Sequence, residues 1–387
     1  MSLNRSDESE AFLGALFPDY GRAPDSVEAK RRQARLIGEI QKEYALEGIA
    51  LFLGAGVSQS LGLPGWRELI DLLTARMLSH RAELAALAIC ERLTEEERWK
   101  LRGTIEIQSA RSKDRGWPVL VMARAIKDEM ADSLAAQIAR ALYHPVRRIL
   151  NAHHETAGLE RACSANGHPP IRRPELPSSE LLDALVYLAR DDGSALRKGV
   201  EAIVNYNFDD LVDRKLQEQG VRCKTSLCGA DAPSRGELPC FHVHGLIRST
   251  DFVSHGTAVA ACGNFVFSED EYHLEYSDAH KWSNLTQLNM LQRYTGVFVG
   301  LSMEDPNLRR LIDVTHAQFP NKVHYAFLRR KHLVAGPNAS VVGRLWEEIA
   351  TKSFERIGVK IVWVDDHNEL PALIRQIRDL RLRSASH

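Results

Sequence analysis

Residues 49–67 read IALFLGAGVSQSLGLPGWR. The first five residues are apolar and are followed by glycine, a pattern that is typical of a buried parallel strand. The segment Gly54-Ala55-Gly56 lets the backbone turn sharply, and a helix after such a turn offers free N–H groups to a phosphate. A strand, a glycine turn and a helix in this order predict the edge of an open α/β sheet where ligands bind.

After residue 195 the sequence alternates between short apolar runs and helical patterns. This alternation predicts a Rossmann-like, doubly wound and mostly parallel α/β sheet. Residues 79–195 lack strand patterns and are interpreted as a large helical insertion, in which 119–143 is one long helical pattern. Residues 1–45 are expected to be an N-terminal extension to one domain over 46–387. The strands expected after the insertion are 202–206, 240–243, 265–267, 296–299, 323–328 and 360–364.

The composition is that of an ordinary globular protein, with 387 residues, 44% hydrophobic content and a formal net charge of -1. This near-zero charge gives no electrostatic reason to expect direct nucleic-acid binding. No apolar stretch approaches the roughly 20 residues of a membrane helix, and residues 1–18 show no signal-peptide pattern. We therefore expect a cytoplasmic protein with no membrane partner.

The six cysteines indicate neither a disulfide framework nor a zinc site. A zinc ribbon uses two C-x2-C pairs, and this sequence has no such pair; Cys223 and Cys228 lack partners. His242 and His244 have a spacing that a metal site could use, but no third ligand is evident nearby. We expect no zinc and no other metal.

Three further polar or glycine-containing clusters follow apolar runs. They are Asn205-Tyr206-Asn207-Phe208-Asp209-Asp210, His242-Val243-His244-Gly245 and Gly300-Leu301-Ser302. Asparagine is disfavoured inside strands, so two of them at a strand end require a reason. Histidine exchanges a proton near neutral pH and suits a general base. Because ligands bind at the carboxyl ends of parallel strands, the four clusters are expected to form one site.

In this order, the four clusters resemble the sirtuin fold, and more closely its bacterial sirtuin-like NADase branch. Residues 62–67 (GLPGWR) are similar to the cofactor-covering loop Gly-Ile-Pro-Asp-Phe-Arg of sirtuins, although Gly65 replaces the aspartate. Residues 207–211 (NFDDL) match the bacterial branch, and His244 with the glycine after it matches the family's His-Gly pair. A dehydrogenase is disfavoured, because Gln59 stands where its fingerprint has a third glycine.

The resemblance implies that Asn207 orients a water molecule or the nicotinamide ribose, that Asp209 holds the nicotinamide carboxamide, and that His244 is the catalytic base. The residues by themselves leave other interpretations open. Asn207 and Asp209 are also suited to capping the helix that follows, and His244 to being a core histidine with a backbone partner. His242 is assigned a structural role.

The remaining predicted contacts are with the phosphates and ribose of the cofactor. Arg67 is expected there, with a solvated first-turn arginine as the alternative. The other cofactor-binding residues that the resemblance implies are Gly54, Ala55, Gly56, Ser58, Gly300 and Ser302. Residues 46–387 would then be a sirtuin-like NAD-binding domain.

The resemblance thus implies an enzyme, an NAD+ glycohydrolase with NAD+ as its substrate and with nicotinamide and ADP-ribose as products. One alternative is an NAD-dependent protein deacylase, and another is a non-catalytic subunit that senses NAD or ADP-ribose. The bacterial branch often acts in antiphage defence and abortive infection by depleting NAD+. On that basis we expect a homo-oligomer, controlled by self-assembly or by a separate regulatory protein such as a HerA-type ATPase.

Overall fold

A computed structural model describes seven stretches of the chain, which are residues 26–90, 93–111, 117–155, 175–190, 198–255, 261–330 and 339–384. The chain divides into two compact units. The first unit comprises residues 1–53, 180–204 and 287–387, and the second comprises residues 54–179 and 205–286. Three of the four predicted clusters therefore belong to the second unit, and the cluster at residues 300–302 belongs to the first.

The described strands form a seven-stranded sheet in the order β3-β4-β2-β1-β5-β6-β7. The pairs β1–β5, β5–β6, β6–β7 and β3–β4 are parallel. Parallel strands that alternate with helices along the chain confirm the predicted Rossmann-like α/β fold. The strands are β1 (Ile49–Leu53), β2 (Val200–Asn205), β3 (Cys223–Ser226), β4 (Leu238–His242), β5 (Thr295–Val299), β6 (His324–Arg329) and β7 (Val359–Val364).

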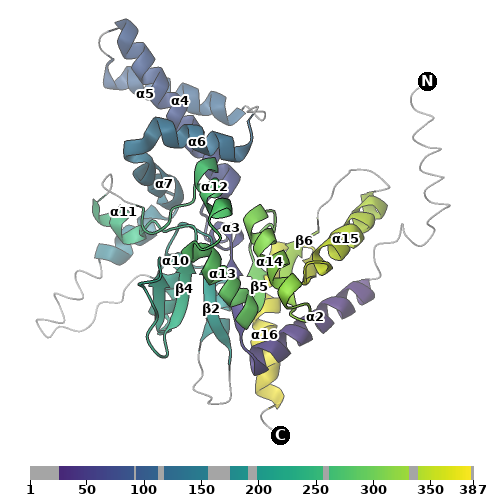
Figure 1. Ribbon diagram of the computed structural model, residues 1–387. Helices are drawn as coiled ribbons and strands as arrows, with labels where there is room; N and C mark the ends of the chain where they lie inside the picture. Colours follow the sequence, from purple (N-terminus) through teal and green to yellow (C-terminus); the bar gives the residue numbers. More distant parts are fainter. Residues whose placement is uncertain are drawn as a thin grey trace, which may run out of the picture. The chain divides into compact units, whose positions relative to one another are not determined.

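The first unit is built on strands whose side chains are buried on both faces. β1 and β5 are buried along their whole lengths, in a register that pairs Ile49 with Thr295 and Leu53 with Val299. Such continuous apolar runs are expected when helices cover both faces of a parallel sheet. In this unit α16 packs against α2 (Figure 1). α16 also packs against α9, and α15 packs against β7. Its helices are α2 (Ser26–Leu46), α9 (Glu180–Ala189), α14 (Pro306–Gln318), α15 (Ala339–Glu355), η2 (His367–Glu369) and α16 (Leu370–Ser384).

The second unit is mainly helical. Between β1 and β2 the described residues contain helices and no strand, and α4 packs against α5, α6 and α7 (Figure 1). α13 (Trp282–Arg293) crosses the boundary between the units. The helices of the second unit are α3 (Ala55–Gln59), α4 (Trp66–Cys90), α5 (Glu95–Arg111), α6 (Val119–Met130), η1 (Ala131–Ser133), α7 (Leu134–Tyr143), α10 (Leu211–Glu218), α11 (Ser249–His255) and α12 (Glu269–Ser277).

Three sequence predictions about these elements are wrong. Residues 265–267 are not a strand; their aromatic side chains pack on one another and on Phe208. The helix expected over 119–143 is interrupted by η1, where the Ser133 hydroxyl bonds the Met130 carbonyl and competes with the helical pattern. Strand β3 was missed, because its four residues are polar or half-buried and carry no apolar signal.

Candidate functional site

The glycine turn and the segment after β2 are joined by a direct hydrogen bond. Gly54 is the N-cap of α3, with an extended backbone and no side-chain cap. Its carbonyl oxygen accepts the Val57 N–H at 3.0 Å and the side-chain N–H of Asn207 at 3.0 Å. Asn207 is buried, and its backbone N–H donates to the side-chain oxygen of Asn205 at 3.0 Å. Two of the predicted clusters are therefore in contact through Asn207.

Asp209 connects this segment to α3 and α10. One carboxylate oxygen accepts the Ser58 hydroxyl at 2.6 Å, and the other accepts the Leu211 N–H at 3.2 Å. Burial raises the pKa of the Asp209 carboxyl, and the Ser58 hydroxyl and the Leu211 N–H act in the opposite direction. Asp209 therefore does stabilise the start of α10, as the capping interpretation requires, and in addition holds Ser58 from the glycine turn.

Sequence reasoning missed the partners of the neighbouring carboxylate, Asp210. One of its oxygens accepts the Ser249 N–H at 3.2 Å and lies 3.4 Å from the Tyr143 hydroxyl, whose nearer acceptor is the Ile247 carbonyl at 2.5 Å. Burial raises the pKa of Asp210, and it raises that of Tyr143 as well. A pair of adjacent aspartates after a buried strand needs hydrogen-bond donors from elsewhere in the fold. This need was the only feature of the sequence that pointed to such partners.

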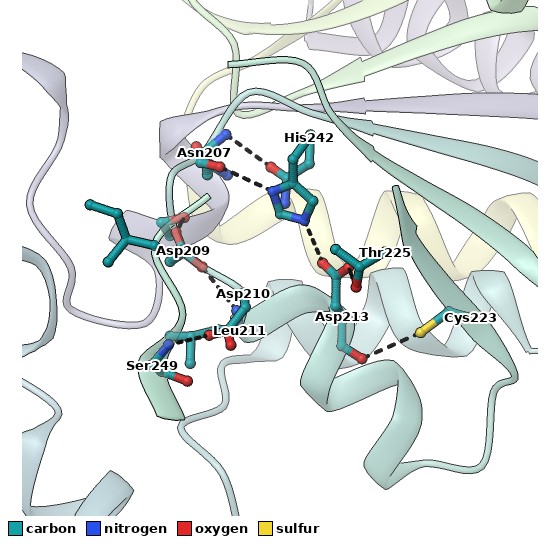
Figure 2. Close-up of polar contacts among 12 residues, drawn as sticks. Asn207, Asp209, Asp210, Leu211, Asp213, Cys223, Thr225, His242 and Ser249 are labelled. Carbon is teal, nitrogen blue, oxygen red and sulfur yellow. Dashed lines mark hydrogen bonds and ion pairs between the residues drawn. The ribbon is translucent and has the colours of Figure 1, made fainter. Parts of the chain in front are cut away.

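His242 is fully buried at the end of β4 and lies between two acceptors. Its Nε2 is 3.0 Å from a carboxylate oxygen of Asp213 on α10, and its Nδ1 is 3.4 Å from the carbonyl oxygen of Asn207 (Figure 2). The other oxygen of Asp213 accepts the Thr225 hydroxyl from β3 at 2.7 Å. His242 therefore ties the Asn207 segment to α10 and β3, and neither Asp213 nor Thr225 was identified from the sequence.

His244 lies on the segment beside Asn205 and Asn207. The Val243 N–H donates to the Asn205 carbonyl at 3.2 Å, which places the end of β4 next to the end of β2. The His244 side chain is mostly buried, with its ring edge-on to Tyr206 at 5.0 Å and near Tyr272 at 5.8 Å. The structure thus brings the predicted base and the predicted amide to adjacent strand ends within one unit.

Gly245 has a backbone conformation that favours glycine. Its φ is 87°, and a Cβ at this position would lie 2.9 Å from the Phe265 Cα. The glycine of the His-Gly pair therefore lets the chain turn close to residues 264–266, and the Val266 N–H in turn donates to the His244 carbonyl at 3.0 Å. This turn fixes the backbone that carries His244.

The segment that resembles the cofactor-covering loop divides into a packed part and an exposed part. The Trp66 ring lies 5.5 Å from Phe267 and 6.3 Å from Phe208, in edge-on contacts. Arg67, the next residue, is exposed at the start of α4. Exposure leaves Arg67 available to a ligand and equally fits a solvated first-turn arginine, so its role stays a prediction.

Gly300 and Ser302 follow β5 in the first unit. Gly300 has a φ of 71°, and the exposed Ser302 accepts the Glu304 N–H at its hydroxyl oxygen, at 3.3 Å. Asp305 then caps α14 by accepting the Leu308 N–H at 2.8 Å. These bonds are loop and cap interactions, and the cofactor contacts implied for Gly300 and Ser302 stay predictions.

The described residues bear on the metal and membrane expectations. Among the described residues, no group of three or more histidine, cysteine or acidic side chains is placed to hold a metal ion. Over the same residues, no helix combines the length and the apolar character needed to cross a membrane.

A cavity of about 490 Å³ is lined by His144, Pro145, Arg147 and Arg148, and it includes none of the predicted site residues.

Comparison with known proteins supports the resemblance at the level of the family. Residues 201–352 match the family model described as a SIR2-like domain. This match spans the strand ends that carry Asn207, His244 and Ser302, and it supports a sirtuin-like family with an NAD-related enzymatic activity in general. No curated protein matches the chain.

Proposed function

We propose that this protein is an NAD+ glycohydrolase that releases nicotinamide and ADP-ribose. The observation that carries the proposal is the bond from the Asn207 amide to the Gly54 carbonyl, with His244 on the adjacent strand end. A glycine turn suited to a diphosphate, an amide and an imidazole lie together in one unit. The SIR2-like match over residues 201–352 identifies NAD as the nucleotide to test.

The chemistry requires breakage of the bond between the ribose C1′ and the nicotinamide nitrogen. Nicotinamide leaves with the bonding electrons, and a water oxygen forms the new bond to C1′. In this proposal Asn207 orients the water, Asp209 accepts the N–H groups of the carboxamide, and His244 takes the proton that the water loses. Burial raises the pKa of the Asp209 carboxyl, and an N–H donor from the carboxamide would add to Ser58 and Leu211 in stabilising its ionised form.

His244 lies in surroundings that are compatible with a general base. It is mostly buried, which limits access of bulk water, and its neighbours are the rings of Tyr206 and Tyr272. His242, by contrast, forms a buried ion pair with Asp213. We therefore assign the proton transfer to His244 and a supporting role to His242.

The experiment is an NAD+ cleavage assay on the purified protein, with nicotinamide and ADP-ribose quantified separately. We expect wild-type turnover and a loss of about 100-fold or more in His244→Ala and in Asn207→Ala. His280→Ala is the matched control, since His280 is an exposed histidine in the same unit. Undiminished turnover by either site variant removes that residue from the mechanism.

Deacylation of an acyl-lysine is the second candidate, because the same family match fits it. The absence of C-x2-C pairs from the sequence separates this chain from sirtuins with a zinc ribbon and favours hydrolysis. An acetyl-peptide added to the NAD+ assay distinguishes the two. Appearance of O-acetyl-ADP-ribose in place of ADP-ribose identifies a deacylase, whereas tight NAD+ binding without nicotinamide release identifies a sensing subunit.

The biological role that we propose by analogy is antiphage defence through NAD+ depletion. An enzyme that drains NAD+ needs control, so the proposal includes a homo-oligomer or a separate regulatory protein such as a HerA-type ATPase. The test is expression in cells challenged with phage, with cellular NAD+ measured over time. Protection that persists in His244→Ala contradicts a role that depends on NAD+ cleavage.

A further inference from the structure

His242 is a buried histidine that lies between two hydrogen-bond acceptors of the candidate site. Its side chain has no exposed surface, and both ring nitrogens face oxygen atoms (Figure 2). The Asp213 carboxylate and the Asn207 backbone carbonyl are acceptors that carry no hydrogen of their own. A neutral imidazole has one N–H and can donate to only one of them. Both contacts become hydrogen bonds only if the ring carries two N–H groups.

The surroundings favour this doubly protonated ring. Burial by itself lowers the pKa of His242, but the Asp213 carboxylate outweighs it and raises the pKa above the ordinary value. The charged groups that face the ring are Asp213 from α10 and Asp209 from the segment before it, and both are carboxylates. Thr225 donates to the outer oxygen of Asp213 and so holds this carboxylate in place.

We infer that His242, as an imidazolium, is a positioning residue that acts on the reaction through the backbone of Asn207. Its Nδ1–H holds the Asn207 carbonyl while the Asn207 side chain donates to Gly54, so the peptide and the amide are each fixed by a hydrogen bond. Asp213 and Thr225 supply the countercharge and its orientation. The effect of His242 on kcat rests on the proposed function, whereas the protonation state of its ring does not.

The first test separates the two ring nitrogens. The amide nitrogen of asparagine reaches the place of Nδ1, and that of glutamine reaches the place of Nε2. We expect His242→Asn to keep the bond to Asn207 and most of the kcat for NAD+ cleavage. His242→Gln should lose about 100-fold in kcat with little change in KM, because the orienting amide is displaced. Equal kcat in the two variants, or a loss confined to His242→Asn, overturns the inference.

The second test uses pH and leaves His242 in place. A neutral ring keeps its single proton on Nε2 beside Asp213 and loses the Nδ1–H, so activity should fall as pH rises through the pKa of His242. Asp213→Asn removes the carboxylate that raises this pKa, so the falling limb of kcat should move to lower pH. A falling limb that stays in place in Asp213→Asn contradicts the role of the charge.

The third test does not depend on activity, so it distinguishes failure of the inference from failure of the proposed function. In protein labelled with ¹⁵N-histidine, the His242 signals are identified by their absence from the His242→Asn spectrum. From the two acceptor contacts we expect both ring nitrogens to be protonated at about pH 7. A neutral ring at that pH overturns the inference even if NAD+ is cleaved. A protonated ring in a protein that does not cleave NAD+ leaves the inference standing and removes the function.

Discussion

The side-chain amide of Asn207 donates a hydrogen bond of 3.0 Å to the carbonyl oxygen of Gly54, a residue 153 positions earlier in the sequence. Both residues follow strands, and both are buried. This bond turns two separate sequence patterns into one structural unit. Replacing the donor nitrogen of the Asn207 side chain with oxygen removes this bond, so the site can be tested without a ligand.

The first prediction is that Asn207→Asp destabilises the protein in a pH-dependent manner. The substitution keeps the side-chain shape but replaces the donor with an oxygen that faces the Gly54 carbonyl oxygen. An ionised carboxyl group buried there without a partner costs about 3 kcal/mol. Because burial raises its folded-state pKa, the variant should lose stability as pH rises above the unfolded-state value of about 3.9.

Urea unfolding of wild type and Asn207→Asp, at about pH 5 and about pH 8, measures this effect. Asn321→Asp is the matched control, because Asn321 is exposed. The control should unfold as the wild type does at both values. A stability deficit of Asn207→Asp that is the same at both pH values would show that the buried-charge argument is wrong.

The second prediction compares two glycines that share the same backbone conformation. Gly62 and Gly245 both have a φ of 87°. A Cβ at Gly62 meets no atom within 4 Å, whereas at Gly245 it would lie 2.9 Å from the Phe265 Cα and 3.1 Å from the Asn264 carbonyl oxygen. Gly62→Ala should therefore cost about 1 kcal/mol, from the backbone conformation alone. Gly245→Ala should cost roughly 1–3 kcal/mol more, from the clash.

Denaturant unfolding of the two alanine variants checks this difference, with each variant serving as the control for the other. In the NAD+ assay, Gly245→Ala should also lower turnover, because the turn fixes the backbone of His244. Equal loss of stability in the two variants would show that residues 264–265 move aside and that the close approach at Gly245 carries no constraint.

The sequence predicted much of this fold because the buried strands have simple signals. Residues 49–53 are apolar without interruption and end in glycine, as a strand covered on both faces requires. The strand predicted at 265–267 is wrong. Its apolar residues suggested a buried strand, but the rings of residues 265 and 267 instead pack in an aromatic cluster. Burial alone does not distinguish a paired strand from a packed loop.

The candidate site was predictable where it depends on the order of residues along the chain. Asn207, Asp209 and His244 could be proposed as candidates because they occur at strand ends in a recognisable order. Asp213 and Thr225 could not be, because their importance comes from contacts with His242 across β3, β4 and α10. A carboxylate on a helix usually faces solvent, and nothing in the local sequence marks Asp213 as buried.

The third prediction concerns the hydroxyl of Ser58. It donates to the Asp209 carboxylate at 2.6 Å and opposes the rise in pKa that burial causes. In Ser58→Ala the pKa of Asp209 should rise further, so a higher pH is needed to ionise it. If the carboxylate binds the carboxamide, the acid limb of kcat/KM for NAD+ should move to higher pH.

The pH profile of kcat/KM for wild type and Ser58→Ala provides the measurement. Ser60→Ala is a suitable control, because Ser60 is exposed and its hydroxyl bonds the Val57 carbonyl and the Ser179 hydroxyl, not a carboxylate. Superimposable acid limbs for wild type and Ser58→Ala would exclude an ionised Asp209 from substrate binding.

The last prediction tests the core of the first unit. His324 in β6 is buried, and its Nδ1 accepts the backbone N–H of Gly296 in β5 at 2.9 Å. A nitrogen that accepts a hydrogen bond cannot carry a proton, so the ring must be neutral in the folded protein. Burial, with smaller effects from Lys322 and His316, lowers the pKa of His324 to about 3.

The direction of the pH dependence follows from this lowered pKa. Unfolded protein binds a proton at His324 below about pH 6.5, whereas folded protein does not until about pH 3. The stabilisation is therefore complete above the unfolded-state pKa and is lost as pH falls through this window. Between about pH 7 and about pH 5 the loss from this group should be about 2 kcal/mol.

His324→Asn places an amide oxygen near the position of Nδ1 and cannot titrate, so its free energy of unfolding should fall less over this range. His367→Asn, at an exposed histidine, should retain the wild-type slope, and parallel curves for wild type and His324→Asn would show that His324 does not control acid stability.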